Sequence, residues 1–165
     1  MRDRSTNVKV KIAGPDAVGP DTEGTNVLFD VWLVSRAATG TLDAALAPSG
    51  LTADEFGIYS VLTSAESMTP SELARWMSAP LTTVSSYVKR IEGRGHLTRV
   101  RNPKDGRSYV LSLTPEGRGA HQAAGERFLP VLDGVVESLG RREPGVRRAL
   151  TDLRRSLDRL DAPGS

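Results

Sequence analysis

The chain has 165 residues, of which 38% are hydrophobic and 25% are charged, and its formal net charge is +2. This composition is typical of one globular domain of ordinary size and not of a disordered chain. The absence of cysteine excludes disulfides, thiolate metal ligands and a cysteine nucleophile, and no apolar run is long enough to span a membrane. Residues 1–10 are too polar for a secretory signal, so we expect a soluble, cytoplasmic protein.

The basic residues are concentrated in the middle of the chain. Residues 69–118 carry nine basic and four acidic side chains, whereas residues 25–68 carry one basic and five acidic ones. A basic block in a nearly neutral chain is the electrostatic pattern of a phosphate-binding module, although basic solvated surfaces are also common.

The first part of the chain is predicted to be a tail followed by one helix. Residues 1–24 are interrupted by Gly-Pro pairs and predict a flexible tail. From Asn26, apolar residues recur every three or four positions, which predicts a helix within residues 25–50 that ends at Pro48-Ser49-Gly50.

Three short helices are predicted next. Capping boxes at Thr52 with Glu55 and at Thr69 with Glu72 mark the starts of two of them. A third begins at Pro80, ends near Gly95, and has an apolar stripe at helical spacing, formed by Val84, Tyr87, Val88 and Ile91.

After residue 96 the apolar period changes from helical to alternating. Residues 97–101 and 109–113 predict two strands, and the turn-forming residues 102–106 between them predict a hairpin. A long helix then starts at Thr114-Pro115 with a kink expected at Pro130, and a last helix starts near Pro144. The last helix has a coiled-coil-like seam, formed by Val146, Leu150, Leu153, Leu157 and Leu160.

This order predicts a mainly α-helical winged helix-turn-helix over residues 51–114, with a small β-hairpin as the wing. The second helix of such a pair lies in a DNA major groove, where hydroxyl groups bond to bases and cations neutralise phosphate. The candidates on its outward face are Thr82, Thr83, Ser85, Ser86, Lys89 and Arg90. The alternative is that these side chains only cap and solvate a surface helix.

The predicted hairpin is strongly basic. An arginine-bearing wing suits the narrow, negative minor groove, and Asp105 is placed to hold Arg107 by a bidentate pair. The alternative is a solvated hairpin with an incidental ion pair. The candidate residues of the wing are Arg99, Arg101, Lys104, Asp105 and Arg107.

Residues 51–117 resemble the MarR family of winged-helix transcription regulators. The resemblance rests on Ser71-Glu72-Leu73-Ala74, Thr83-Val84-Ser85, Asp105-Gly106-Arg107 and Leu113-Thr114-Pro115-Glu116-Gly117, of which the last two are the most specific. The flanking helices extend the resemblance to residues 26–161. Ser86 departs from the family pattern, which often has arginine there, so this chain lacks one partner for a base or phosphate unless Lys89 or Arg90 compensates.

The resemblance implies a homodimer built from the first helix, residues 25–50, and the C-terminal helices, residues 115–161, that binds a palindromic double-stranded DNA operator as a repressor. The implied dimer contacts are Leu28 and the five residues of the seam. Many members of the family bind small aromatic effectors, and the residues that could line such a pocket are Trp32, Arg36, Tyr59 and Trp76. The alternative is that the tryptophans and Tyr59 are core residues.

No catalytic, metal or cofactor site is predicted. Only two histidines exist, His96 and His121, without metal-ligand spacing, and Gly117-Arg118-Gly119 lacks the features of a phosphate loop. We expect His96 to be structural and His121 to lie at the surface or a subunit interface. The remaining rival functions are nonspecific DNA binding and protein–protein contact without effector control.

Overall fold

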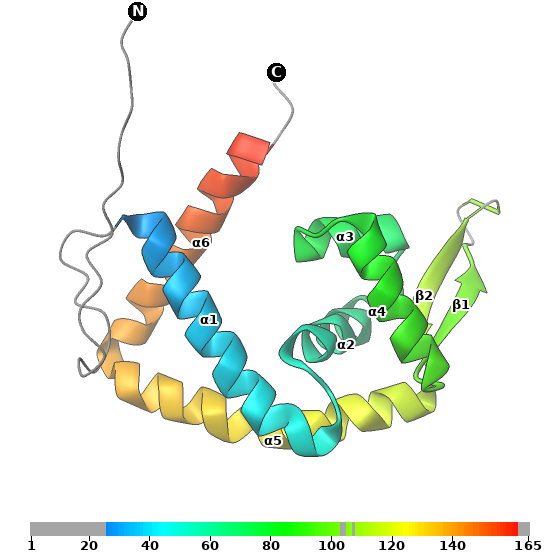
Figure 1. Cartoon of the computed structure of the whole chain (residues 1–165), viewed down its shortest axis with the longest axis horizontal. Coiled ribbons are helices and arrows are strands. Elements are labelled where there is room, and N and C mark those ends of the chain that lie inside the picture. The colour runs from blue at the N-terminus through cyan, green and yellow to red at the C-terminus, as the bar shows by residue number, and fades with distance from the viewer. Residues whose placement is uncertain (1–25, 103–104, 107, 162–165) are drawn as a thin grey trace, which may run out of the picture. The chain divides into compact units, whose positions relative to one another are not determined.

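The computed structural model describes residues 26–102, 105–106 and 108–161. It forms two units, residues up to Thr41 and residues from Leu42 onward, with the division inside the first helix. The elements are α1 (Val27–Leu46), η1 (Ala47–Ser49), α2 (Ala53–Ala65), α3 (Pro70–Met77), α4 (Leu81–Gly93), β1 (Leu97–Arg101), β2 (Tyr109–Leu113), α5 (Pro115–Leu139), η2 (Gly140–Arg142) and α6 (Glu143–Asp161). The α-helices and the two strands are labelled in Figure 1. The mainly α-helical class with one hairpin is confirmed.

Local signals set the starts and ends of these helices. Both predicted capping boxes are formed, because Thr52 and Thr69 accept from the backbone N–H three residues on and the glutamates reach back. Gly50, which follows η1, has φ 73°, a left-handed conformation that glycine adopts without strain. Pro130 lies inside α5, which continues as one helix to Leu139 rather than ending there.

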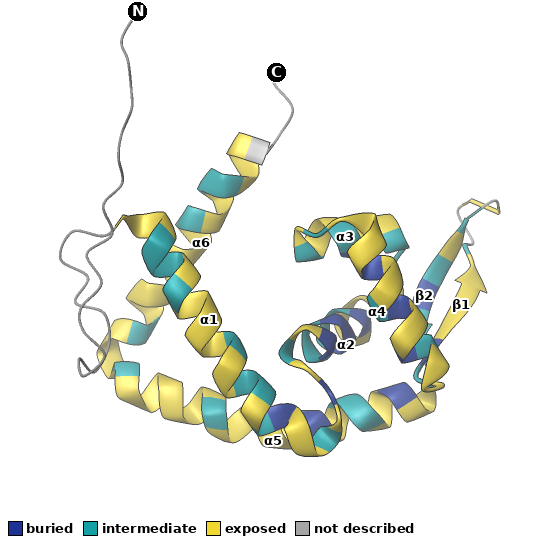
Figure 2. Ribbon diagram, viewed as in Figure 1, coloured by how far each residue is buried: buried dark blue, intermediate teal, exposed yellow. Residues whose placement is uncertain are grey.

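The core lies between α2, α3, α4 and the hairpin and is closed by the start of α5 (Figure 2). The buried stripe predicted for α4 is present, with Tyr87 half-buried at its edge. The central buried residues are Leu46, Ile58, Tyr59, Leu62, Leu73, Val84, Val88, Ile91, Leu97, Leu111 and Leu113.

The hairpin pairs β1 and β2 antiparallel, from Leu97 opposite Leu113 to Arg101 opposite Tyr109. A bridge between Met68 and Leu111 ties the α2–α3 connection to β2. Only β2 alternates in burial, because its Leu111 and Leu113 face the core while β1 is exposed beyond Leu97. The wing therefore packs on the core mainly through β2, with Leu97 as the one buried residue of β1.

The start of α5 approaches the end of α4 very closely. Thr114 donates its N–H to the carbonyl of His96 at 3.1 Å and its hydroxyl to the carbonyl of Gly95 at 2.8 Å. A Cβ on Gly117 would lie 2.1 Å from the same His96 carbonyl oxygen, so only glycine fits. This explains why the Leu-Thr-Pro-x-Gly segment has glycine at its fifth position.

Candidate nucleic-acid interface

The outward face of α4 carries short hydroxyl side chains and two cations. This helix packs against α3, and its opposite face is buried in the core through Val84, Val88 and Ile91, which are at most 2% exposed. The hydroxyl of Ser86 donates to the carbonyl of Thr82 at 3.1 Å. As the helical spacing predicts, the exposed residues of this face include Thr82, Thr83, Ser85, Ser86, Lys89 and Arg90.

Arg90 is not the free surface cation that the sequence predicts. Its Nε donates to Oε1 of Glu55 at 2.6 Å, and Nη1 of Arg94 lies 3.2 Å from the same oxygen. Glu55 is fully buried in α2, and its Oε2 accepts the N–H of Thr52. Burial alone raises the pKa of Glu55, but the Thr52 hydrogen bond and the two guanidinium groups outweigh it and lower the pKa, so the carboxylate is charged.

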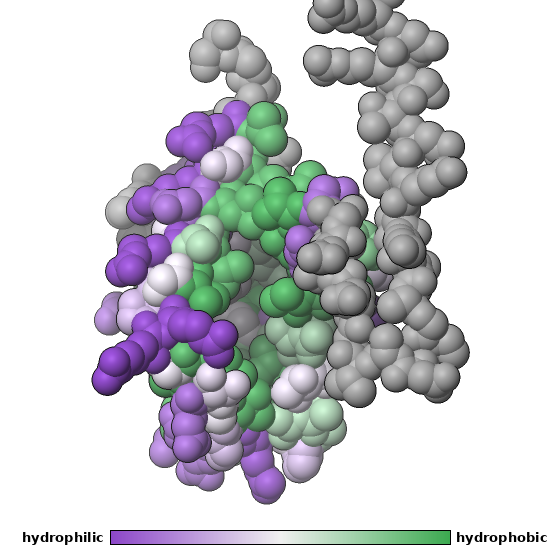
Figure 3. Space-filling view, turned by 90° about the vertical axis from the view of Figure 1, so that its left-hand side faces the viewer, coloured by the Kyte–Doolittle hydropathy of each residue, from purple (hydrophilic) through white to green (hydrophobic). Residues whose placement is uncertain are grey.

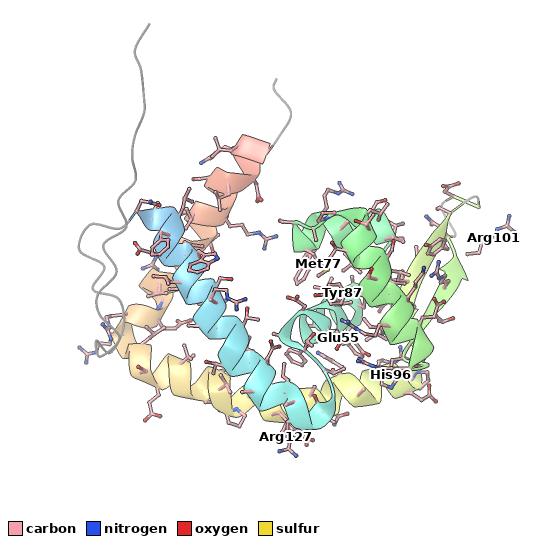
Figure 4. The ribbon with its side chains drawn as sticks, viewed as in Figure 1. Glu55, Met77, Tyr87, His96, Arg101 and Arg127 are labelled. Atoms are coloured by element: carbon pink, nitrogen blue, oxygen red, sulfur yellow. The ribbon has the colours of Figure 1, made fainter. Side chains whose placement is uncertain are left out.

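Tyr87 supports Arg90 from a second side. The guanidinium carbon of Arg90 lies 5.0 Å from the centre of the Tyr87 ring, within cation–π range. The hydroxyl of Tyr87 donates to Oδ2 of Asp54 at 2.5 Å. That hydrogen bond to Asp54, with burial, raises the pKa of Tyr87 to about 12. Two consecutive acids at the start of α2 therefore hold side chains of α4, and Figure 4 shows Glu55 and Tyr87 between these helices.

The predicted wing residue Arg99 is also paired. Its Nε and Nη2 both contact the carboxylate of Glu92 on α4, at 3.0 Å for the closest atoms, and its guanidinium lies 4.8 Å from the ring centre of Tyr109. The hydrogen bond to Glu92 raises the pKa of Arg99. Glu92 is half-exposed and joins α4 to the hairpin through this ion pair.

The end of the hairpin holds the remaining wing candidates. Arg101, labelled in Figure 4, lies against the turn of the hairpin, where its Nε donates to the carbonyl of Gly106 at 3.2 Å. Asp105 is exposed, and its carbonyl accepts the N–H of Ser108 at 3.0 Å. Lys104 and Arg107 lie outside the described residues, so the predicted pair of Asp105 with Arg107 stays a prediction.

Comparison with known proteins gives a family for this arrangement. A model of the MarR family matches residues 49–108, from η1 to the hairpin. The multiple antibiotic resistance protein MarR of Salmonella typhimurium is 28% identical over 100 residues, which cover 58% of this chain and 69% of the relative. The HTH-type transcriptional repressor Rv2887 of Mycobacterium tuberculosis is 31% identical over 83 residues, half of this chain and 60% of the relative. Residues 49–108 of the chain are therefore similar to the winged helix of the MarR family.

The MarR fold extends beyond the matched residues. The M. tuberculosis transcriptional regulator MosR, solved in complex with DNA, superposes with a TM-score of 0.73 at 27% identity, over 83% of this chain and 99% of MosR. BldR of Sulfolobus solfataricus has the same fold, with a TM-score of 0.70 at 21% identity. The fold predicted from the sequence is therefore that of MarR-family transcriptional regulators.

The four residues predicted for a MarR effector pocket belong to two different units of the structure. Tyr59 is fully buried, and its hydroxyl lies 2.9 Å from Nδ1 of His96, so it is a core residue, which was the alternative interpretation. Trp76 is exposed and borders a shallow depression with residues of α2 and with Met68. Trp32 and Arg36 lie on α1 in the other unit, where Trp32 stacks on Phe29.

Apolar side chains remain exposed on the helices outside the winged helix. In the space-filling view of Figure 3, hydrophobic residues gather into green areas rather than lying singly among hydrophilic ones. Of the predicted dimer contacts, Leu153 and Leu157 are half-buried and Leu28, Val146, Leu150 and Leu160 are exposed. On α5 the exposed large apolar residues are Leu129, Leu132, Val135 and Val136.

Both histidines join elements of the winged helix to their surroundings. His96 bonds to Tyr59 in the core, as its structural assignment predicts. His121 on α5 is half-buried, stacks on Phe56 and lies within hydrogen-bond distance of the hydroxyls of Ser60 and Thr63 on α2. Among the described residues, no three side chains of metal-ligating type come together, and no helix is long and apolar enough to cross a membrane.

Sequence reasoning misses the residues that hold the basic side chains in place. The local pattern assigns Glu55 only to a helix cap and Tyr87 only to the buried stripe, and it does not single out Asp54. One feature of the sequence could have indicated these contacts. Arg90 and Arg94 are four positions apart, which puts two cations on one side of the helix, and residues 25–68 carry the net negative charge that could pair with them.

Proposed function

We propose that this protein is a transcriptional repressor that binds a palindromic operator as a homodimer, with α4 in the major groove and the hairpin at the minor groove. The single observation that carries this is the exposed face of α4, where four hydroxyl side chains and two cations adjoin an arginine-bearing hairpin. The DNA complex of MosR and the repressor Rv2887 support it as relatives.

The proposed roles differ along α4. Hydroxyl groups near its N-terminus, such as Thr83 and Ser85, contact base edges, while Lys89 and Arg90 contact phosphates. Because Ser86 replaces a frequent arginine of the family, we expect the preferred operator to differ from those of arginine-bearing members.

The test is to select duplexes from a random pool with the protein and measure affinity for the selected and for unselected DNA over a range of salt. Thr83→Ala and Ser85→Ala should lower the preference for the selected sequence, by about 1–3 kcal/mol for each base that is no longer bonded. Lys89→Ala should weaken both duplexes alike and flatten the salt slope by about one for each phosphate that this lysine neutralises. Equal affinity of the unaltered protein for both duplexes would favour the nonspecific alternative.

The wing has its own test. Arg107→Ala is expected to weaken operator binding by about 1–3 kcal/mol per contact. Asp105→Ala is also expected to weaken it, because Arg107 would have to be ordered on binding, although simple charge repulsion predicts the opposite sign. Tighter binding by Asp105→Ala would show that Asp105 is only a charge on a solvated hairpin.

We also propose that the exposed apolar residues of α1, α5 and α6 form the dimer contact. They are large and exposed, and they lie on helices outside the compact core. Exposed apolar residues that cluster on such helices often mark a protein contact. A small aromatic effector is the remaining part of the proposal, and Trp32, Arg36 and Trp76 are the residues left for it. Since Trp32 and Trp76 are the only tryptophans, titration of their fluorescence with benzoates and phenols tests it.

A further inference from the structure

The two cations on the exposed face of α4, Lys89 and Arg90, differ in how firmly their side chains are held. Lys89 is exposed, and no hydrogen bond or ion pair of its amine is found among the described residues. Arg90 is fixed by Nε to the buried carboxylate of Glu55 and lies over the ring of Tyr87. Its side chain nevertheless remains 50% exposed.

Arg90 and Arg94 both contact the carboxylate of Glu55, but they differ in exposure and in the role that we assign to them. Arg94 is the more covered of the two, at 33% exposure, and it contributes a second positive charge against Glu55. Arg90 donates to Glu55 through Nε, which leaves its terminal nitrogens as donors on the exposed side. A guanidinium held by an ion pair and a ring loses little side-chain entropy when it binds a phosphate.

We propose that Glu55 is a positioning residue for DNA binding, which holds Arg90 on its Tyr87 platform with the terminal nitrogens directed toward the DNA backbone. This inference rests on the proposed function. It assigns a DNA-binding role to an acidic side chain that does not reach the surface, and it makes Arg90 a stronger phosphate contact than Lys89.

For the change in DNA affinity caused by Glu55→Gln, the inference predicts the opposite sign to simple electrostatics. Replacing Glu55 by Gln removes a negative charge near the DNA-facing helix, which should tighten binding to phosphate if only charge mattered. If Glu55 acts by ordering Arg90, the same change weakens binding, because Arg90 must then be ordered when DNA binds. Glutamine also serves in capping boxes, so the start of α2 is retained.

The experiment measures the affinity of the full chain for a fluorescent mixed-sequence duplex at one low salt concentration, and for duplexes selected from a random pool. The mixed duplex reports phosphate contacts without requiring the operator to be known. Glu55→Gln should weaken binding about fivefold per contacting subunit, the ordering cost of one long side chain. Glu126→Gln, which removes an exposed acid from α5, is the charge-matched control and should leave affinity unchanged or raise it.

A double-mutant comparison separates positioning from a merely structural role. The weakening caused by Glu55→Gln should persist in a Lys89→Ala background and disappear in an Arg90→Ala background. Arg90→Lys should weaken binding less than Arg90→Ala but should not reach the affinity of the unaltered protein, since lysine keeps the charge but lacks the Nε–H that pairs with Glu55. Thermal unfolding of each variant ensures that affinity is compared between folded proteins.

Three results would overturn the inference. They are tighter DNA binding by Glu55→Gln, an equal weakening by Glu55→Gln in the Lys89→Ala and Arg90→Ala backgrounds, and an unchanged DNA affinity of Arg90→Lys. These leave the proposed function intact, because the unaltered protein still binds DNA. If the unaltered protein binds neither the mixed nor the selected duplexes, the proposed function itself fails, and this inference fails with it.

Discussion

In the winged helix, apolar side chains are buried within the chain itself, whereas on α6 they are not. Leu46, Leu73 and Leu111 are 0% exposed in the core of the winged helix. On α6, Leu150 is 51% and Leu160 is 80% exposed, although they belong to a regular seam. The contrast is between a stripe that is completed inside the fold and a stripe that is left largely exposed, which we propose a second subunit covers.

The polar contacts of the two regions also differ: those of the winged helix join separate elements, whereas those of α6 stay within one helix. Around the core, the charged side chain of Glu55 is buried and satisfied by three donors from two elements. On α6, the ion pairs join residues three or four apart on the same exposed helix, Arg155 with Asp152 and Arg147 with Glu143. Such surface ion pairs contribute little to stability, so we expect the packing of α6 to be stabilised mainly through its apolar face.

The strongest way to break this comparison is to put charges into the α6 seam. Leu153→Asp combined with Leu157→Asp should abolish dimerisation, because two carboxylates would be buried without partners. Sedimentation at micromolar concentration checks this, and tight DNA binding should disappear with the dimer. Thr151→Asp, an acid on the other face of α6, is the control and should stay dimeric. An unaltered protein that sediments as a monomer would contradict the prediction.

The second test compares one leucine from each region in that monomeric background. Leu73→Ala should cost about 2–5 kcal/mol of unfolding free energy, because it leaves a cavity in the core. Leu150→Ala should cost little there, since its side chain is already half-exposed. Denaturant unfolding measures both, and similar costs would show that α6 packs within its own chain.

The third test sharpens the account of the junction between the core and α5. Gly117→Ala should destabilise the fold by about 1–3 kcal/mol, since its Cβ would meet the His96 carbonyl. Gly119→Ala is the matched control, because nothing lies within 4 Å of its Cβ and alanine favours the helix by about 0.5–1 kcal/mol. Opposite shifts in melting temperature are expected, and a tolerated Gly117→Ala would refute the close approach.

The smallest expected effect concerns His121, which joins α5 to α2. Burial lowers its pKa below the usual 6.5, so the folded protein binds this proton less readily than the unfolded chain. The stability that follows is fully present above pH 6.5 and is lost as the pH falls through the pKa of the folded state. Unfolding measured across this range should show a steeper decline for the unaltered protein than for His121→Gln. Parallel curves would exclude a role for His121.

Local sequence determined the elements of this protein. The capping boxes at Thr52 and Thr69, the glycine after η1 and the buried stripe of α4 depend on residues a few positions apart, so spacing alone predicts them. The change from a helical to an alternating period likewise predicted the hairpin. The same spacing placed Arg90 on the outward face, which is where it lies.

Tertiary structure alone decided which of these side chains are held and by what. Glu55 and Arg90 are 35 positions apart and Tyr59 and His96 are 37 apart, so no local pattern relates them. Spacing by itself makes Glu55 a cap and Arg90 a free cation, and the family resemblance makes Tyr59 a candidate pocket wall. Packing α4 across α2 joined the first two into one ion pair, with Glu55 buried and Arg90 half-exposed, and enclosed the third, because a charge removed from water must find its partner in whichever element covers it.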